Sequence, residues 1–114
     1  MHVTAGVLHI DLTVPERVLS LHRADLRVPV ERVRVVTPVT DIIAQLRGAR
    51  LPGARVPGRF AIGTWSGERD GLPFHDFVVV HRPGPGVVLG LAGAAYDRIL
   101  LGDPEPQALI DELF

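Results

Sequence analysis

The chain has 114 residues, of which 46% are hydrophobic and 5% aromatic, and its formal net charge is −1. This length and composition suffice for one hydrophobic core, so we expect a single domain over residues 1–114. The near-neutral charge and the few aromatic side chains argue against a nucleic-acid-binding surface. The absence of cysteine excludes disulfides, thiolate catalysis and cysteine-ligated metal sites.

Every one of the twelve basic residues is arginine. One interpretation is a coding bias toward GC-rich codons, and the other is selection for bidentate contacts with anions. The N-terminal residues lack the basic and apolar regions of a signal peptide. The longest uncharged run, from Pro83 to Tyr96, is too short and too rich in glycine to span a bilayer. These patterns predict a cytoplasmic protein with no transmembrane segment.

The first part of the chain has the alternation of a β-hairpin. Apolar and polar residues alternate from Leu8 to Val14, which predicts a half-buried strand. Pro15-Glu16 can turn the chain into a second strand at 17–22. We therefore expect two antiparallel strands before residue 23.

A third strand is predicted next. Leu26 to Pro29 is extended, because the residue before a proline avoids the helical region. Val30 to Val36 is rich in β-branched residues, with Val33 and Val35 on one face. Pro38 should end this strand, since proline cannot donate to a central ladder.

A short helix and an unusual loop follow. Thr40-Asp41 can cap a helix from Ile42 to Arg47, with Gly48 in the C′ position. In residues 48–59 the pattern Gly-Ala-Arg-(Leu/Val)-Pro-Gly occurs twice, sharing Gly53. Each Pro-Gly pair has the signature of a type II turn. We therefore expect a turn-rich loop leading into the fourth strand.

Four more strands and a helix complete the predicted chain. The strands are expected at 59–65, 74–81, 87–91 and 96–101, with a polar turn at 66–73. Asp103-Pro104 resembles a helix start, and the stripe after it comprises Leu109, Ile110, Leu113 and Phe114. About seven short strands followed by a helix indicate an all-β fold with a C-terminal helix, forming a sandwich or small antiparallel barrel. The helix would cover one open end and bury Leu109, Leu113 and Phe114.

This order of elements resembles the pleckstrin-homology (PH) superfold. Residues 28–33, the Gly48-x-Arg50-x-Pro52-Gly53 motif and Gly63-Thr64-Trp65 are similar to a small, largely actinobacterial group of PH-like proteins of unknown function. The resemblance covers nearly the whole chain. It implies a barrel of about seven strands capped by one amphipathic helix, and it assigns no catalytic or ligand residues. PH domains that bind phosphoinositides use a basic loop between their first two strands, whereas here Val14-Pro15-Glu16-Arg17 places a Glu beside its Arg.

The candidate binding residues lie in the 47–59 segment. They are Arg47, Arg50, Arg55 and Arg59, and no acid occurs between Asp41 and Glu68. Four guanidinium groups near glycine N–H donors can bind a phosphate or a carboxylate. Alternatively, these arginines solvate the loop and pair with acids elsewhere on the fold. A site also requires that they share one surface, so Arg50 and Arg55 on opposite sides would leave none.

Catalytic and metal-binding alternatives have weaker patterns. Ser66, Asp70 and His75 fall in one turn region, but no Gly-x-Ser-x-Gly elbow surrounds the serine. His75 and His81 are six strand residues apart, about 20 Å, which is too far for a metal pair. We therefore predict no catalytic residues, no metal site and no cofactor. The expected function is a non-catalytic binding module for a protein partner or an anionic group. A self-associating protein that pairs through a strand edge is the alternative, and a small-barrel hydrolase ranks last.

Overall fold

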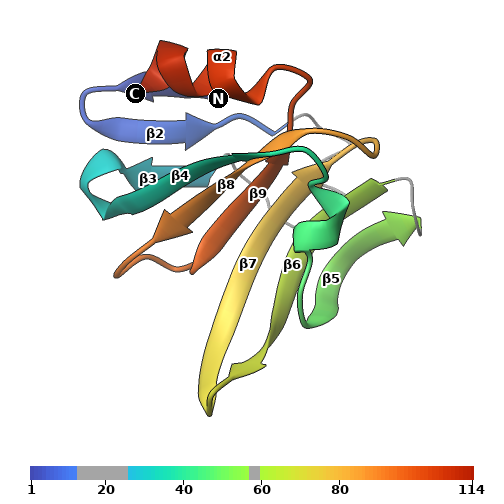
Figure 1. Cartoon of the computed structure of the whole chain (residues 1–114). Coiled ribbons are helices and arrows are strands. Elements are labelled where there is room, and N and C mark those ends of the chain that lie inside the picture. Colours follow the sequence, from blue (N-terminus) through green and yellow to red (C-terminus); the bar gives the residue numbers. More distant parts are fainter. Residues whose placement is uncertain (13–25, 57–59) are drawn as a thin grey trace.

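The structure is a computed structural model that describes residues 1–12, 26–56 and 60–114, with the backbone alone described at 49–56 and at 60. It consists of two β-sheets and a C-terminal helix (Figure 1). The predicted class, mostly β with a C-terminal helix, is therefore confirmed. The predicted hairpin at 8–22 lies largely outside the described residues.

The smaller sheet has three antiparallel strands in the order β1-β2-β3. They are β1 (His2–Thr4), β2 (Val7–Ile10) and β3 (Leu26–Pro29). Ala5 and Gly6 join β1 to β2 with φ angles of 51° and 75°. Positive φ at both central residues is the geometry of a tight type I′ hairpin turn. The sequence pattern predicted β2 and β3 as extended segments but did not predict β1.

The larger sheet has six strands in the order β4-β8-β9-β7-β6-β5. They are β4 (Val33–Val39), β5 (Ala49–Val56), β6 (Phe60–Arg69), β7 (Leu72–Val80), β8 (Gly86–Leu91) and β9 (Arg98–Gly102). The β7–β9 pair is parallel, and the others are antiparallel. Among the described residues the sheets do not close into a barrel. The predicted seven-stranded barrel is thus not confirmed, and the expectation of purely antiparallel pairing is wrong.

The parallel pair arises from the connection between β7 and β8. Residues 81–85, which contain Pro83-Gly84 and Pro85, carry the chain past the position of β9 to β8, two places along the sheet. The chain then returns by an antiparallel step, so that β9 fills the gap beside β7. Periodicity along the sequence indicates strands but not which strands become neighbours, which is why the pattern missed this pairing.

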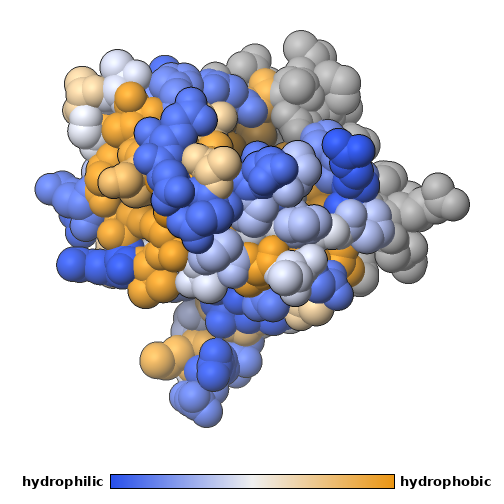
Figure 2. Space-filling model, turned by 45° about the horizontal axis from the view of Figure 1, so that its top comes forward, coloured by the Kyte–Doolittle hydropathy of each residue, from blue (hydrophilic) through white to orange (hydrophobic). Residues whose placement is uncertain are grey.

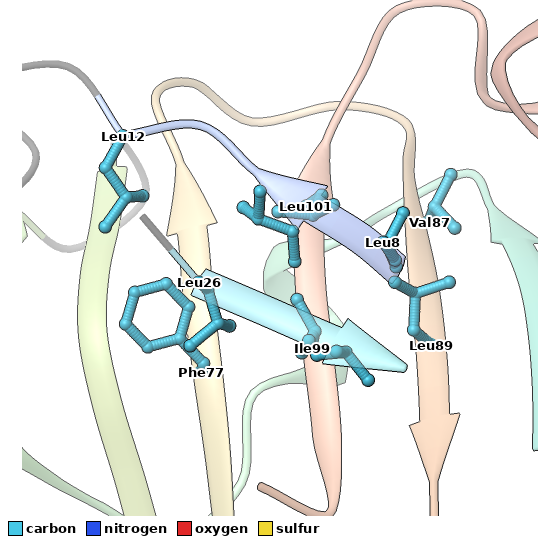
Figure 3. Close-up of a cluster of buried hydrophobic side chains, with 10 residues drawn as sticks. Leu8, Leu12, Leu26, Phe77, Val87, Leu89, Ile99 and Leu101 are labelled. Atoms are coloured by element: carbon cyan, nitrogen blue, oxygen red, sulfur yellow. The ribbon is translucent and has the colours of Figure 1, made fainter. Parts of the chain in front are cut away.

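One face of the six-stranded sheet packs against the three-stranded sheet. The buried side chains of this first cluster come from both sheets (Figure 3): Leu8, Ile10, Leu12, Leu26, Val28, Phe77, Val87, Leu89, Ile99 and Leu101. Two facing sheets with inward-pointing aliphatic side chains form the interior of a β-sandwich. Each fully buried side chain of this size contributes about 1.5–3 kcal/mol.

The opposite face carries a second, smaller cluster. Its buried members are Ile42, Ala61, Trp65, Val78, Val80 and Leu100. Val39 packs against it from the end of β4, and Ile43 and Leu46 do so from the segment between β4 and β5. The predicted alternation of β7 is confirmed, because Phe77 and Val79 join the first cluster and Val78 and Val80 the second.

The third predicted strand begins later than expected. A 3₁₀ turn, η1 (Val30–Arg32), precedes β4, and the register shifts between Val33 and Val35. This bulge breaks the alternation, so Val35 is 58% exposed while Val36 packs against the first cluster. Pro38 lies inside β4 rather than ending it. An edge strand tolerates proline because one side of its backbone needs no donor.

The predicted helix at 42–47 is a 3₁₀ turn, η2 (Ile43–Gln45). Asp41 still acts as a local acceptor, since its Oδ1 accepts the N–H of Ala44 at 3.3 Å. Gly48 has a φ of +74°, which confirms the predicted left-handed residue after Arg47. Of the residues predicted to form two helical turns, Ile42 is the one that is fully buried, and a single 3₁₀ turn suffices to place it.

Two predicted loops are strands. Residues 49–56 form β5 instead of consecutive Pro-Gly turns, although Pro57, Gly58 and Arg59 lie outside the described residues. The predicted polar turn at 66–73 is the end of a long hairpin, whose turn is Asp70-Gly71 with φ angles of 53° and 78°. Asp-Gly is a strong type I′ signal, and it outweighs the polar composition around it. The hairpin projects from the body of the molecule (Figure 1) and leaves Leu72 71% exposed.

The C-terminal helix α2 (Pro106–Leu113) starts two residues later than the Asp103-Pro104 pattern suggested. The Oδ1 atom of Asp103 instead accepts the N–H of Glu105 at 2.8 Å. Leu109 and Ile110 pack against the first cluster, and Phe114 is 49% exposed. The prediction that Leu109, Leu113 and Phe114 are buried is therefore wrong, because Leu109 and Leu113 are only half-buried and Phe114 is exposed. In the view that brings the top of Figure 1 forward, apolar and hydrophilic patches are interspersed on the surface (Figure 2).

Candidate functional site

Arg47, the first of the four candidate arginines, is bonded to a buried carboxylate. Its Nε donates to Asp76 Oδ2 at 2.7 Å and its Nη2 donates to Asp76 Oδ1 at 3.0 Å. The side chain of Asp76 is only 1% exposed, while that of Arg47 is 26% exposed. The guanidinium carbon also lies 4.1 Å from the centroid of the Phe74 ring. This geometry combines a bidentate ion pair with a cation–π contact.

A second arginine shares the same carboxylate. Arg98 donates from Nε and Nη2 to Asp76 Oδ2 at 3.1 and 2.9 Å, and from Nη2 to the carbonyl oxygen of Gln45 at 2.8 Å. Strand pairing brings the two residues together, because Asp76 on β7 lies directly opposite Arg98 on the parallel strand β9. We call Arg47, Asp76 and Arg98 the ion triad. It connects the turn before β5 to the middle of the sheet.

The charges of the triad stabilise one another. The hydrogen bond to Asp76 raises the pKa of Arg47, burial opposes that rise, and the nearby charges of Asp76 and Asp97 add to it. Asp76 accepts four hydrogen bonds from two guanidinium groups, three of them at Oδ2 and one at Oδ1. A buried carboxylate is tolerated only when it is compensated in this way. Arg47 is therefore a structural tether.

Gly48 follows the tether at a tightly packed position. Its φ of +74° is in the left-handed region, and a Cβ atom there would clash with the backbone oxygen of Ser66. The same atom would come within 2.9 Å of Phe74 Cζ. Only glycine therefore lets the chain turn from Arg47 into β5 this close to β6.

Arg50 and Arg55 belong to β5, and a bulge sets their register. Arg50 lies opposite Trp65, Arg55 lies opposite Ala61, and the register shifts by one residue between Arg50 and Gly53. Trp65 and Ala61 both belong to the second cluster, so they share one face of β6. In a regular strand, residues five apart fall on opposite faces, whereas one extra residue restores the phase. The backbone register thus assigns the positions of Arg50 and Arg55 to the same face.

The four candidate arginines therefore do not form one group. Arg47 is committed to Asp76, which is the outcome that the alternative interpretation of these arginines expected. Arg50 and Arg55 occupy register positions on one face of the sheet. Arg59 lies outside the described residues. Sequence reasoning missed Asp76 and Arg98, although Asp76 has the same alternation as buried Val78 and Val80, which was the available signal.

The residues weighed for catalysis are not gathered into a triad. Ser66 and His75 are directly opposed on β6 and β7, but Asp70 is in the hairpin turn, about 13 Å along the strand at 3.3 Å per residue. His75 and His81 are both exposed. Within residues 1–12, 26–56 and 60–114, no group of three or more potential ligand side chains could hold a metal ion.

The two outer strands of the six-stranded sheet carry the same protective features. β4 contains Pro38 and a bulge between Val33 and Val35, and β5 contains Pro52 within its own bulge. Proline removes a backbone donor, and a bulge twists the edge, so both features hinder the pairing of a further strand. Self-association through a strand edge remains a prediction, and these features oppose it at β4 and β5.

No family model matches the chain, and comparisons with curated proteins and with solved structures also return no match. In the part of the chain that the structure describes, no helix is long and apolar enough to cross a membrane.

Proposed function

We propose that this chain is a non-catalytic binding module of PH-like type that binds an anionic group through the 47–59 segment, with Arg50 and Arg55 as its principal contacts. The observation that carries the proposal is the β5 bulge, which brings these two positions into register with one face of β6. Arg59 follows β5 in the chain and is the third candidate donor.

The charge distribution around β5 supports this function. No acidic residue occurs between Asp41 and Glu68, so β5 and both of its flanks contain no internal counter-ion. Asp76 lies in the same cross-strand row as Arg50, through Trp65. Because Asp76 is already paired with the two guanidinium groups of Arg47 and Arg98, its single charge is a weak counter-ion for a third arginine. Guanidinium groups favour phosphate or carboxylate ligands, because their planar donors match the oxygens of these anions in pairs.

The tether supports the same proposal by fixing where β5 begins. Arg47 is bonded to Asp76, and Gly48 is in contact with β6, so the backbone enters β5 at a defined place. Donors held by a rigid element lose less conformational entropy on binding than donors on a free loop. In this proposal Arg47 positions the site and does not contact the ligand.

The test uses inorganic phosphate as the probe and thermal unfolding as the readout. A ligand that binds only the folded state at ten times its Kd stabilises that state by about 1.4 kcal/mol. We expect phosphate to raise the Tm of the wild type, and sodium chloride to weaken the gain through screening. The Arg50→Gln/Arg55→Gln double variant should lose the gain.

The matched control is Arg69→Gln/Arg82→Gln, which removes two exposed arginines outside β5 and its flanks. It should keep the full gain. A gain that survives in the Arg50→Gln/Arg55→Gln variant, or disappears in the control, contradicts the proposal. Phosphate and an acidic partner protein present the same chemistry. Pull-down with the same pair of variants separates them, because a partner protein should be lost only with the β5 variant.

A further inference from the structure

A groove lies between β3 and the connection from β8 to β9. Its volume is about 260 Å³. The walls on the β3 side are Leu26, Arg27, Val28, Pro29 and Arg32, and those on the other side are Leu91, Gly93, Ala94, Ala95 and Tyr96. Typical drug-sized ligands occupy pockets of roughly 300–1,000 Å³, so this groove suits a smaller molecule.

The groove combines apolar walls with positive charge. Leu26 and Val28 are buried in the first cluster, and Tyr96 packs its ring against Phe77 with centroids 5.3 Å apart. Arg27 and Arg32 are exposed, and no acidic side chain lines the groove within the described part of the chain. A ligand with an apolar body and one negative charge complements such a surface.

Arg32 is held against the groove by the β8–β9 connection. A Cβ atom on Gly93, whose φ is +69°, would come within 2.5 Å of Arg32 Nη1, so the guanidinium lies directly over this glycine. A backbone hydrogen bond joins the same two segments, because Ala92 donates its N–H to the carbonyl oxygen of Arg32 at 2.9 Å. A guanidinium with a preset position loses less freedom when it binds a carboxylate.

We propose that this groove binds a carboxylate carried on a short alkyl chain, with Arg32 at the charged end and the walls formed by Leu26, Val28 and Tyr96 around the chain. The size of the groove limits the alkyl part. The proposal is independent of phosphate binding at β5, since the two sites share no residue.

The test is a titration with butanoate, hexanoate and octanoate at constant ionic strength, followed by amide chemical shifts. Each methylene that enters an apolar site tightens binding about fourfold. We expect the affinity to rise along the series and the shifts to concentrate at residues 26–32 and 91–96. Octanol, which lacks the charge, should bind at least about tenfold more weakly than octanoate, as expected for a lost charge-assisted bond.

Arg32→Gln should weaken octanoate about tenfold or more and leave octanol binding unchanged. Arg34→Gln, an exposed residue on β4 outside the groove, is the matched control and should bind octanoate as the wild type does. Ala95→Phe, which fills the groove at an exposed position, should abolish binding of both probes without using the charge. Equal affinity for octanoate and octanol, shifts elsewhere on the fold, or octanoate binding that Arg32→Gln and Ala95→Phe leave intact would each overturn the proposal.

Discussion

The two faces of the six-stranded sheet are covered in different ways. The first face meets a second sheet, and ten buried side chains of the described residues lie between them. Within the described part of the chain, the second face meets the short segment between β4 and β5, with six buried side chains and the ion triad beside them. A whole sheet buries enough apolar area to hold its position, whereas a short segment does not. The segment on the second face is therefore held by ion pairs, whereas the sheet on the first face is held by its buried apolar area.

This difference also separates two roles for arginine. Arg47 and Arg98 lie where the second face is tethered, and both form ion pairs with Asp76. Arg50 and Arg55 lie farther along the chain, on β5, and Asp76 already has two cationic partners. Arg47 and Arg98 thus stabilise the structure, whereas in our proposal Arg50 and Arg55 bind the ligand.

The largest effect is expected from Asp76→Asn. Removing this charge leaves two part-buried guanidinium groups without their counter-ion, and breaking a buried pair in this way costs about 3–5 kcal/mol of unfolding free energy. Urea unfolding measures the loss. Asp70→Asn makes the same chemical change at the exposed turn of the same hairpin and should stay within about 0.5 kcal/mol. Equal losses in both variants would show that the triad does not hold the second face.

Neighbouring residues on β9 compare the two apolar clusters directly. Ile99 belongs to the first cluster, Leu100 belongs to the second, and both are fully buried. Truncation of either to alanine should cost about 2–5 kcal/mol, since each leaves a cavity. If Leu100→Ala were as mild as a surface substitution, the second face would not be packed as described.

Arg47→Gln should cost about 1.5–3 kcal/mol, the usual contribution of hydrogen bonds to a charged group. The pKa of Arg47 is raised by its bond to Asp76. A cation with a raised pKa contributes stability below its unfolded pKa and loses it only as the pH rises through the folded pKa. The stability difference between wild type and variant should therefore be constant from about pH 6 to about pH 9. A difference that shrinks across this range would contradict the assignment.

The smallest expected effect separates two glycines with similar backbone angles. Gly48 and Gly71 have φ angles of 74° and 78°, but only Gly48 lacks room for a Cβ atom. Gly71→Ala should cost about 1–2 kcal/mol for the left-handed conformation alone. Gly48→Ala should cost more than that, because the added carbon meets the backbone of Ser66. Identical losses, measured by urea unfolding, would argue against the close contact between the tether and β6.

Local sequence patterns predicted where the strands lie better than which strands pair with one another. The alternation in β7 and the Gly48 turn were predictable, because both depend on neighbouring residues in the sequence. The parallel β7–β9 pair was not, since it depends on where the chain returns after residue 85. The Pro-Gly pattern at 48–56 predicted turns, but pairing with β6 absorbs Pro52-Gly53 into a bulge. Tertiary pairing thus outweighed turn propensity there.

The candidate site was partly predictable for the same reason. The run of arginines without acids is visible in the sequence, and it singled out Arg47, Arg50, Arg55 and Arg59. That Arg47 bonds Asp76, 29 residues away, depends on the packing of η2 over the sheet. The shared face of Arg50 and Arg55 depends on a single extra residue in β5, which alternation alone would have contradicted.

The most direct measurement compares phosphate-induced stabilisation in Arg47→Gln and in Arg50→Gln/Arg55→Gln. The tether variant should be less stable than the wild type in buffer, yet phosphate should still raise its Tm. The β5 variant should keep its stability in buffer and lose the phosphate gain. The reverse pattern, with the gain lost in Arg47→Gln and retained in Arg50→Gln/Arg55→Gln, would contradict the division between structural and binding arginines.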